Sequence, residues 1–134
     1  MLKKSLFLLF ACCAVTVLVG CNSFKNNHRT IQEITNHFID SGIEVDVIQP
    51  LFPYFNSEIA VSMEISGKEI GIYKYNTNVE KQRLRLEQII DDGCVYVEGM
   101  KFPVIVNGSF MLFAYEVNPQ RDRIIEIFNS FPNK

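Results

Sequence analysis

The chain has 134 residues, of which 48% are hydrophobic and 21% charged, and its formal net charge is −2. This length indicates a single domain, and a content of 11 Phe and 5 Tyr excludes a disordered or collagen-like chain. The slightly acidic balance argues against a protein whose main partner is nucleic acid.

The first twenty residues have the pattern of an export signal. Lys3 and Lys4 precede an uncharged run of 14 residues, 6–19. That length suits the apolar region of a signal peptide, whereas a membrane span needs about 20 residues. The run leads into Leu18, Val19, Gly20 and Cys21. At these four positions the chain resembles the bacterial lipoprotein precursors, whose lipobox reads Leu, a small residue, Gly or Ala, and then Cys.

The resemblance implies a covalent lipid on Cys21, and we predict no cofactor besides this lipid. Signal peptidase would recognise Leu18, Val19 and Gly20 and cleave just before Cys21, whose sulfur would carry a diacylglyceryl group. Two or three acyl chains hold a protein firmly on a membrane, whereas one holds it only marginally. Two alternatives stay open: an ordinary cysteine after an ordinary signal peptide, or an uncleaved anchor.

The expected location is membrane-anchored and extracytoplasmic. By the same resemblance, Asn22 after the cysteine suits sorting to the outer membrane in a bacterium with two membranes. In a host with one membrane, the anchor would face outward from the cytoplasmic membrane. After cleavage Cys94 is the single unlipidated cysteine. We expect Cys94 to be a small buried hydrophobic residue, with a reactive nucleophile as the alternative.

The predicted cleavage before Cys21 divides the chain into three segments. Residues 1–20 form the signal peptide, 21–29 the lipidated N-terminus with a polar tether, and 30–134 a single domain. Eight extended tether residues would span about 25 Å.

In the first half, Thr30 and Glu33 form a capping box that opens a helix ending at Gly42, with Ile31, Ile34, Phe38 and Ile39 as its apolar stripe. Alternation over 43–47 predicts a strand, and two prolines make 49–57 a loop. Residues 59–65 and 68–75 read as a hairpin around Ser66 and Gly67.

In the second half, Thr77 and Glu80 form another capping box, for a helix that ends at Gly93. Strands are expected at 94–98, 102–106 and 110–117, the last of them central, with a turn at Asn107 and Gly108. Asn118 and Pro119 then open a final helix, whose apolar stripe is Ile124, Ile125, Ile127, Phe128 and Phe131.

The predicted fold is α+β, with an antiparallel sheet of about six short strands and three helices. Residues 38–42 resemble 89–93, and 65–68 resemble 106–109, at offsets of 51 and 41 residues. These similarities raise the hypothesis of two αβββ-like halves. Chance agreement of turn residues explains them almost equally well.

No motif for catalysis or metal binding is evident. His28 and His37 are the two histidines, and the chain has no His-x-x-x-His, Cys-x-x-Cys, Gly-x-Ser-x-Gly or phosphate-binding loop. The carboxylate pairs Asp91–Asp92 and Glu44–Asp46 are expected to be solvated. We therefore predict no catalytic residue and no metal.

Two features are candidates for partner binding. Leu51, Phe52, Tyr54 and Phe55 surround a proline in a predicted loop, where they either cover the core or present an aromatic patch to a protein or the bilayer. Arg121 and Arg123 fall in the first turns of a helix, where cations oppose the helix dipole. They would pair with a carboxylate within the chain or with an outside partner.

The leading functional hypothesis is a lipid-anchored, non-enzymatic binding or assembly-support module of the bacterial envelope. One alternative is a protective inhibitor or immunity-type lipoprotein that blocks an incoming toxin, phage or hydrolase. A further alternative is a small envelope hydrolase that uses a carboxylate or Cys94.

We predict that Cys21→Ser stays unprocessed and incorporates no labelled palmitate, because the acceptor sulfur is lost. Gel mobility and palmitate labelling in cells measure both effects. A Cys12→Ser variant, altered within the signal itself, should mature and label like wild type. If Cys21→Ser also matures and labels normally, the lipoprotein interpretation is wrong.

Overall fold

The computed structural model describes residues 24–134, which form three helices and seven strands. In chain order the elements are α2 (Ile31–Asp40), β1 (Val47–Leu51), β2 (Ile59–Ile65), β3 (Lys68–Lys74), α3 (Glu80–Asp92), β4 (Cys94–Val97), β5 (Met100–Pro103), β6 (Ile105–Asn107), β7 (Phe110–Phe113) and α4 (Arg121–Ser130).

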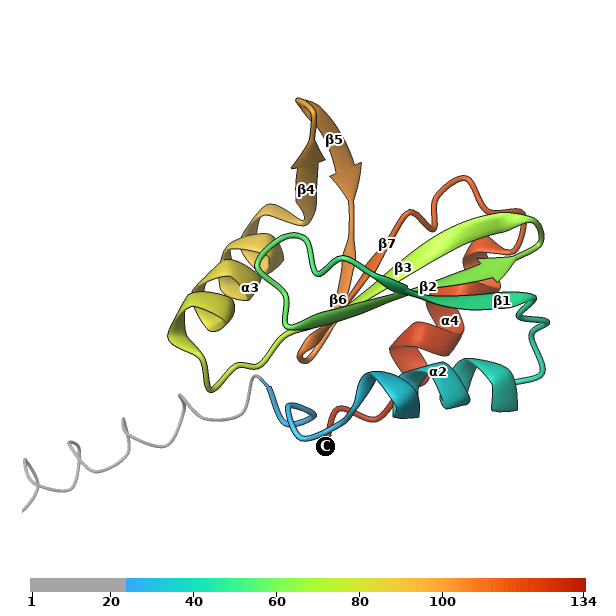
Figure 1. Cartoon of the computed structure of the whole chain (residues 1–134), viewed down its shortest axis with the longest axis horizontal. Helices are drawn as coiled ribbons and strands as arrows, with labels where there is room; N and C mark the ends of the chain where they lie inside the picture. The colour runs from blue at the N-terminus through green and yellow to red at the C-terminus, as the bar shows by residue number, and fades with distance from the viewer. Residues whose placement is uncertain (1–23) are drawn as a thin grey trace, which may run out of the picture.

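The strands form a five-stranded antiparallel sheet of order β1-β2-β3-β7-β6 and a separate β4–β5 hairpin. Helices α2 and α4 pack on one face of the sheet, while α3 and the hairpin lie beside the other face (Figure 1). This arrangement confirms the predicted α+β class with an antiparallel sheet. Strand β7 is paired on both sides, as its apolar sequence predicted.

Two hydrophobic clusters explain why the sheet is buried on both faces. Alternate residues of a strand point to opposite faces. Met63 and Ile72 accordingly belong to the cluster under α2 and α4, whereas Ala60 and Tyr73 belong to the cluster under α3. The sequence did not predict burial of the second face of β2, because this face carries the polar residues Ser62 and Glu64. Its burial depends on α3, which follows later in the chain.

Residues 24–29 are packed against the domain, although the sequence predicted a tether. Asn26 is fully buried, and its side-chain Oδ1 accepts hydrogen bonds from the backbone N of Ser109 at 2.8 Å and from Ser109 Oγ at 3.1 Å. Its Nδ2 donates to the carbonyl of Asn107 at 3.2 Å. The folded domain therefore begins at least six residues earlier than the predicted boundary at residue 30.

The neighbouring Asn27 attaches the same segment to the end of β3 and to the residues that follow it. Its Oδ1 accepts a hydrogen bond from the backbone N of Thr77 at 2.8 Å. The ammonium of Lys74, which is only 4% exposed, donates to the carbonyls of Asn27 at 2.9 Å and Tyr75 at 2.6 Å. These bonds supply the partners that a buried cation requires.

The first helix and the hairpins follow the local signals of the sequence. Thr30 and Glu33 form the predicted capping box, and Gly42 has a positive φ just after α2. The β2–β3 turn at Ser66 and Gly67 is also as predicted. The β6–β7 turn lies one residue later than expected, because Asn107 pairs with Phe110 and leaves Gly108 and Ser109 as the turn residues.

Other boundaries differ from the predictions. The expected strand at 43–47 is shifted to Val47–Leu51, so that Pro50 lies within β1. A proline is compatible with this position because β1 is an edge strand. The second capping box does not form, since the cap of α3 is Val79 and makes no side-chain bond. Helix α4 begins at Arg121, three residues after Asn118, whose side chain bonds instead to the N of Gln120 and the carbonyl of Ile65.

The two halves of the chain are not equivalent. The first helix is followed by three strands of one sheet, whereas α3 is followed by four strands divided between the sheet and the separate hairpin. The matching tetra- and pentapeptides mark similar turns within different surroundings.

We predict that Asn26→Ala lowers the free energy of unfolding by about 2–3 kcal/mol, because a buried N–H that loses its partner costs about 1–3 kcal/mol and other bonds are lost with it. Chemical denaturation measures the change. His28→Ala, at an exposed position of the same segment, is the matched control and should be neutral. If Asn26→Ala is as stable as wild type, the result would favour the prediction that this segment is a tether.

Candidate functional site

The predicted lipidation site, Leu18 to Cys21, lies outside the residues that the structure describes. Within residues 24–134, no helix has both the length and the apolar character needed to cross a bilayer.

The candidate binding loop, 51–57, divides into residues that face the core and residues that face solvent. Leu51 and Phe55 pack against the cluster under α3. Phe52 is 67% exposed and Tyr54 57% exposed, and their ring centroids lie 4.8 Å apart. Leu51 and Phe55 therefore cover the core, whereas Phe52 and Tyr54 are exposed to solvent, and their role in binding stays a prediction. We call Phe52 and Tyr54 the exposed aromatic pair.

Hydrogen bonds hold the loop in an uncommon backbone conformation. Phe55 and Asn56 have φ of 59° and 58°, a region that non-glycine residues seldom occupy. The hydroxyl of Tyr75 donates to the carbonyl of Phe55 at 2.9 Å, and Ser57 donates to that of Tyr54 through its N and Oγ. Burial raises the pKa of the Tyr75 phenol, which keeps this donor protonated. The exposed aromatic pair is thus held by a rigid support.

The exposed aromatic pair belongs to a larger group of aromatic rings. Phe55 lies 5.3 Å from Tyr73 and 5.7 Å from Phe113, and Phe113 lies 5.5 Å from Phe102, measured between ring centroids. These distances are typical of favourable ring pairs. The loop is therefore connected through β3 and β7 to the base of the β4–β5 hairpin.

The β4–β5 hairpin adds exposed apolar side chains near its tip. It stands clear of the five-stranded sheet (Figure 1). Tyr96 and Met100 are largely exposed, while Cys94 and Val95 at its base are buried. The predicted burial of Cys94 is confirmed.

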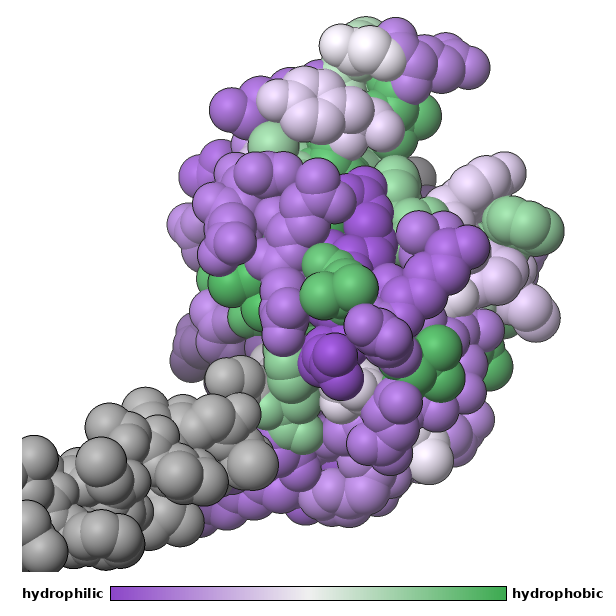
Figure 2. All heavy atoms as spheres, turned by 90° about the vertical axis from the view of Figure 1, so that its left-hand side faces the viewer, coloured by the Kyte–Doolittle hydropathy of each residue, from purple (hydrophilic) through white to green (hydrophobic). Residues whose placement is uncertain are grey.

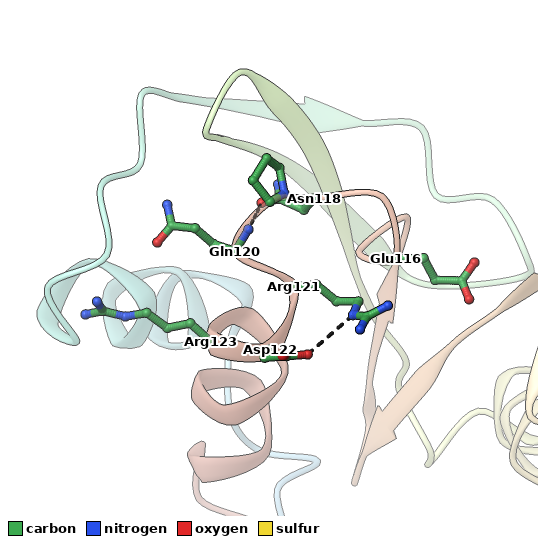
Figure 3. Close-up of a pocket in the computed structure, with 7 residues that line it drawn as sticks. Glu116, Asn118, Gln120, Arg121, Asp122 and Arg123 are labelled. Carbon is green, nitrogen blue, oxygen red and sulfur yellow. Dashed lines mark hydrogen bonds and ion pairs between the residues drawn. The ribbon is translucent and has the colours of Figure 1, made fainter.

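Arg121 and Arg123 do not form a joint site. They line an open depression of about 410 Å³, but their side chains point in opposite directions (Figure 3). Arg121 pairs with the adjacent Asp122 at 3.3 Å on the surface. Arg123 Nη2 donates to the carbonyl of Ser41 at 3.2 Å, just after α2, which satisfies a group left free at a helix end. An intramolecular contact therefore explains Arg123.

A larger depression of about 650 Å³ lies beside the N-terminal segment and includes Lys74 and Glu58 in its lining. The hydrogen bonds of Lys74 are already directed to backbone carbonyls. Burial lowers the pKa of Lys74, and Glu58 opposes this effect. Lys74 therefore serves to attach the N-terminal segment.

His37 also has a structural role, since its Nε2 lies 2.9 Å from both the carbonyl of Ile127 and Ser130 Oγ on α4. In the described part of the chain, no group of three His, Cys, Asp or Glu side chains is placed to hold a metal ion.

Sequence reasoning missed the residues that support the site. Phe102, Phe113 and Tyr73 were treated only as strand residues. The signal in the sequence that could have indicated the hairpin is Gly99, because glycine is common in tight turns. In the structure Glu98 and Gly99 form the turn and both have a positive φ.

No protein-family model, curated protein or solved structure matches this chain.

We predict that Phe55→Ser lowers the free energy of unfolding by about 2–3 kcal/mol, since loss of a core-packed Phe is costly. Phe52→Ser, the matched exposed variant, should change it by less than about 0.5 kcal/mol. Thermal and denaturant unfolding of both variants measure this difference. A large loss of stability in Phe52→Ser would show that the exposed aromatic pair serves the core.

Proposed function

We propose that the chain is a lipid-anchored protein of the bacterial envelope whose domain binds another protein through Phe52 and Tyr54. The observation that carries this proposal is an exposed aromatic pair held in a fixed loop conformation. Aromatic side chains are common anchors of protein interfaces because they bury a large area at a small cost in conformational entropy.

The rigidity of the loop supports binding because the partner would not have to order it. Association costs free energy for each flexible side chain or loop that becomes fixed. Here Tyr75 and Ser57 already fix the backbone on either side of Asn56. The loop is therefore already ordered when the domain folds, and binding does not add the entropic cost of ordering it.

The β4–β5 hairpin extends the proposed contact surface. Its Phe102 joins the ring cluster that supports the loop, and Tyr96 and Met100 expose further apolar area. A partner that contacts both the loop and the hairpin would bury more area than the exposed aromatic pair alone offers.

The side chains of the aromatic loop are poorly suited to catalysis. Phe52 and Tyr54 offer apolar surface and one phenol, whereas acid–base or nucleophilic catalysis needs convergent groups that exchange protons or attack a substrate. The loop is suited to recognition.

Site-specific photocrosslinking in cells tests the proposal. We predict that a photoreactive phenylalanine analogue at Phe52 forms a discrete protein adduct, and that Tyr54→Ser reduces this adduct without lowering the melting temperature. The same analogue at Val117, which is also strongly exposed but follows β7, should give no such adduct. Equal adducts from both positions, or none from Phe52, would contradict the proposal.

A further inference from the structure

On the side of the domain where α3 lies, hydrophobic residues appear as separate spots on a mainly hydrophilic surface (Figure 2). This pattern does not indicate a second docking surface. A reactive group that the proposed function leaves unused lies at the β6–β7 turn, where Asn107 precedes Gly108. The amide of an asparagine is chemically labile before glycine, because glycine has no Cβ to hinder attack by its backbone N on the neighbouring Cγ.

The side-chain amide of Asn107 joins the sheet to the last helix. Its Nδ2 donates to the carbonyls of Phe128 and Phe131, both at 2.9 Å. These carbonyls belong to the end of α4, where groups without an intrahelical partner need other donors. The single amide group therefore satisfies two acceptors at once.

The backbone around Asn107 also holds the N-terminal segment. The carbonyl of Asn107 accepts a hydrogen bond from Asn26 Nδ2 at 3.2 Å, and the N of Ser109 donates to Asn26 Oδ1 at 2.8 Å. Figure 1 shows the β6–β7 turn, the first described residues and the C-terminus near one another at the bottom of the view. A chemical change at Asn107 would thus affect both ends of the folded chain.

Deamidation at this position has a defined course. The backbone N of Gly108 loses its proton and attacks Cγ of Asn107, and a cyclic imide closes as the Cγ–Nδ2 bond breaks. The leaving nitrogen takes up a proton and departs as ammonia. Water then opens the imide at either of its two carbonyls, which gives aspartate or isoaspartate.

The fold opposes the first step of this reaction. Asn107 is the last residue of β6, and the extended backbone of a strand holds the following N away from the residue's own Cγ. The two hydrogen bonds to α4 fix the side chain in addition. Ring closure therefore requires local opening of the strand end and of the contact with α4.

We propose that Asn107 is a deamidation site that the folded domain keeps closed, and that its conversion releases the end of α4 and the N-terminal segment. An aspartate here would direct a carboxylate at the carbonyls of Phe128 and Phe131, and all of these groups are acceptors. The C-terminal end of a helix is also its negative end. An isoaspartate would add a methylene to the backbone of the turn that bonds to Asn26. Because ammonia is lost, the change is one-way.

Peptide mapping by mass spectrometry of the full protein, incubated at neutral pH, measures conversion at Asn107. We expect it to be at least about tenfold slower in the native protein than in the protein unfolded in urea, since only locally opened molecules react. Asn26→Ala should accelerate conversion in the native protein several-fold. His28→Ala, at an exposed position of the same segment, should leave the rate unchanged.

Asn56, which precedes Ser57, is an internal reference for lability of the sequence itself. In urea Asn107 should convert faster than Asn56, because serine hinders the attack more than glycine does. Equal rates for Asn107 in native and unfolded protein would overturn the protection by the fold. Failure of Asn107 to convert in urea would show that it is not a deamidation site.

Hydrogen exchange tests the structural consequence. Protein aged until Asn107 has converted, and fresh Asn107→Asp, should exchange faster than wild type at residues 24–29 and 128–131, while the β2–β3 hairpin stays protected. Asn107→Ala, which removes the same donors without adding a charge, should show a smaller effect at neutral pH. In acid the Asp variant should become the better protected of the two, because a protonated acid can donate to one carbonyl. Unchanged exchange in both segments after conversion would overturn the release.

Discussion

The buried amide of Asn26 connects parts of the chain that are far apart in sequence. It bonds to the β6–β7 turn, where Gly108 leaves no Cβ that would overlap the amide. Asn107 in turn donates to the carbonyls of Phe128 and Phe131 at the end of α4, both at 2.9 Å. The N-terminal segment, the sheet and the last helix are therefore held in one arrangement.

The sequence predicted those features that depend on residues only a few positions apart, because the interactions that form them are local. The capping box of Thr30 and the Ser66–Gly67 turn are of this kind. Asn26 was not readable, because it bonds to a residue 83 positions away and a polar segment has the same composition whether it is packed or free. The start of β1 was misplaced for a related reason: Pro50 is unfavourable in most strands, and only the position of β1 at the sheet edge makes it acceptable.

The candidate site shows the same limit. The sequence identified an unusual aromatic loop, but it did not show which rings face the core. That division depends on the positive φ of Phe55 and on the distant Tyr75 hydroxyl. Similarly, the unfavourable helix position of Arg123 was visible, whereas its partner, the carbonyl of Ser41, became evident only once α2 and α4 were packed together.

The edges of the sheet limit its pairing with a second copy of the chain. An unpaired edge strand exposes backbone donors and acceptors through which the sheets of two copies can join. Here one edge strand, β1, contains Pro50, and the other, β6, has three residues. Neither edge offers a long row of unpaired donors and acceptors, which disfavours the joining of sheets edge to edge.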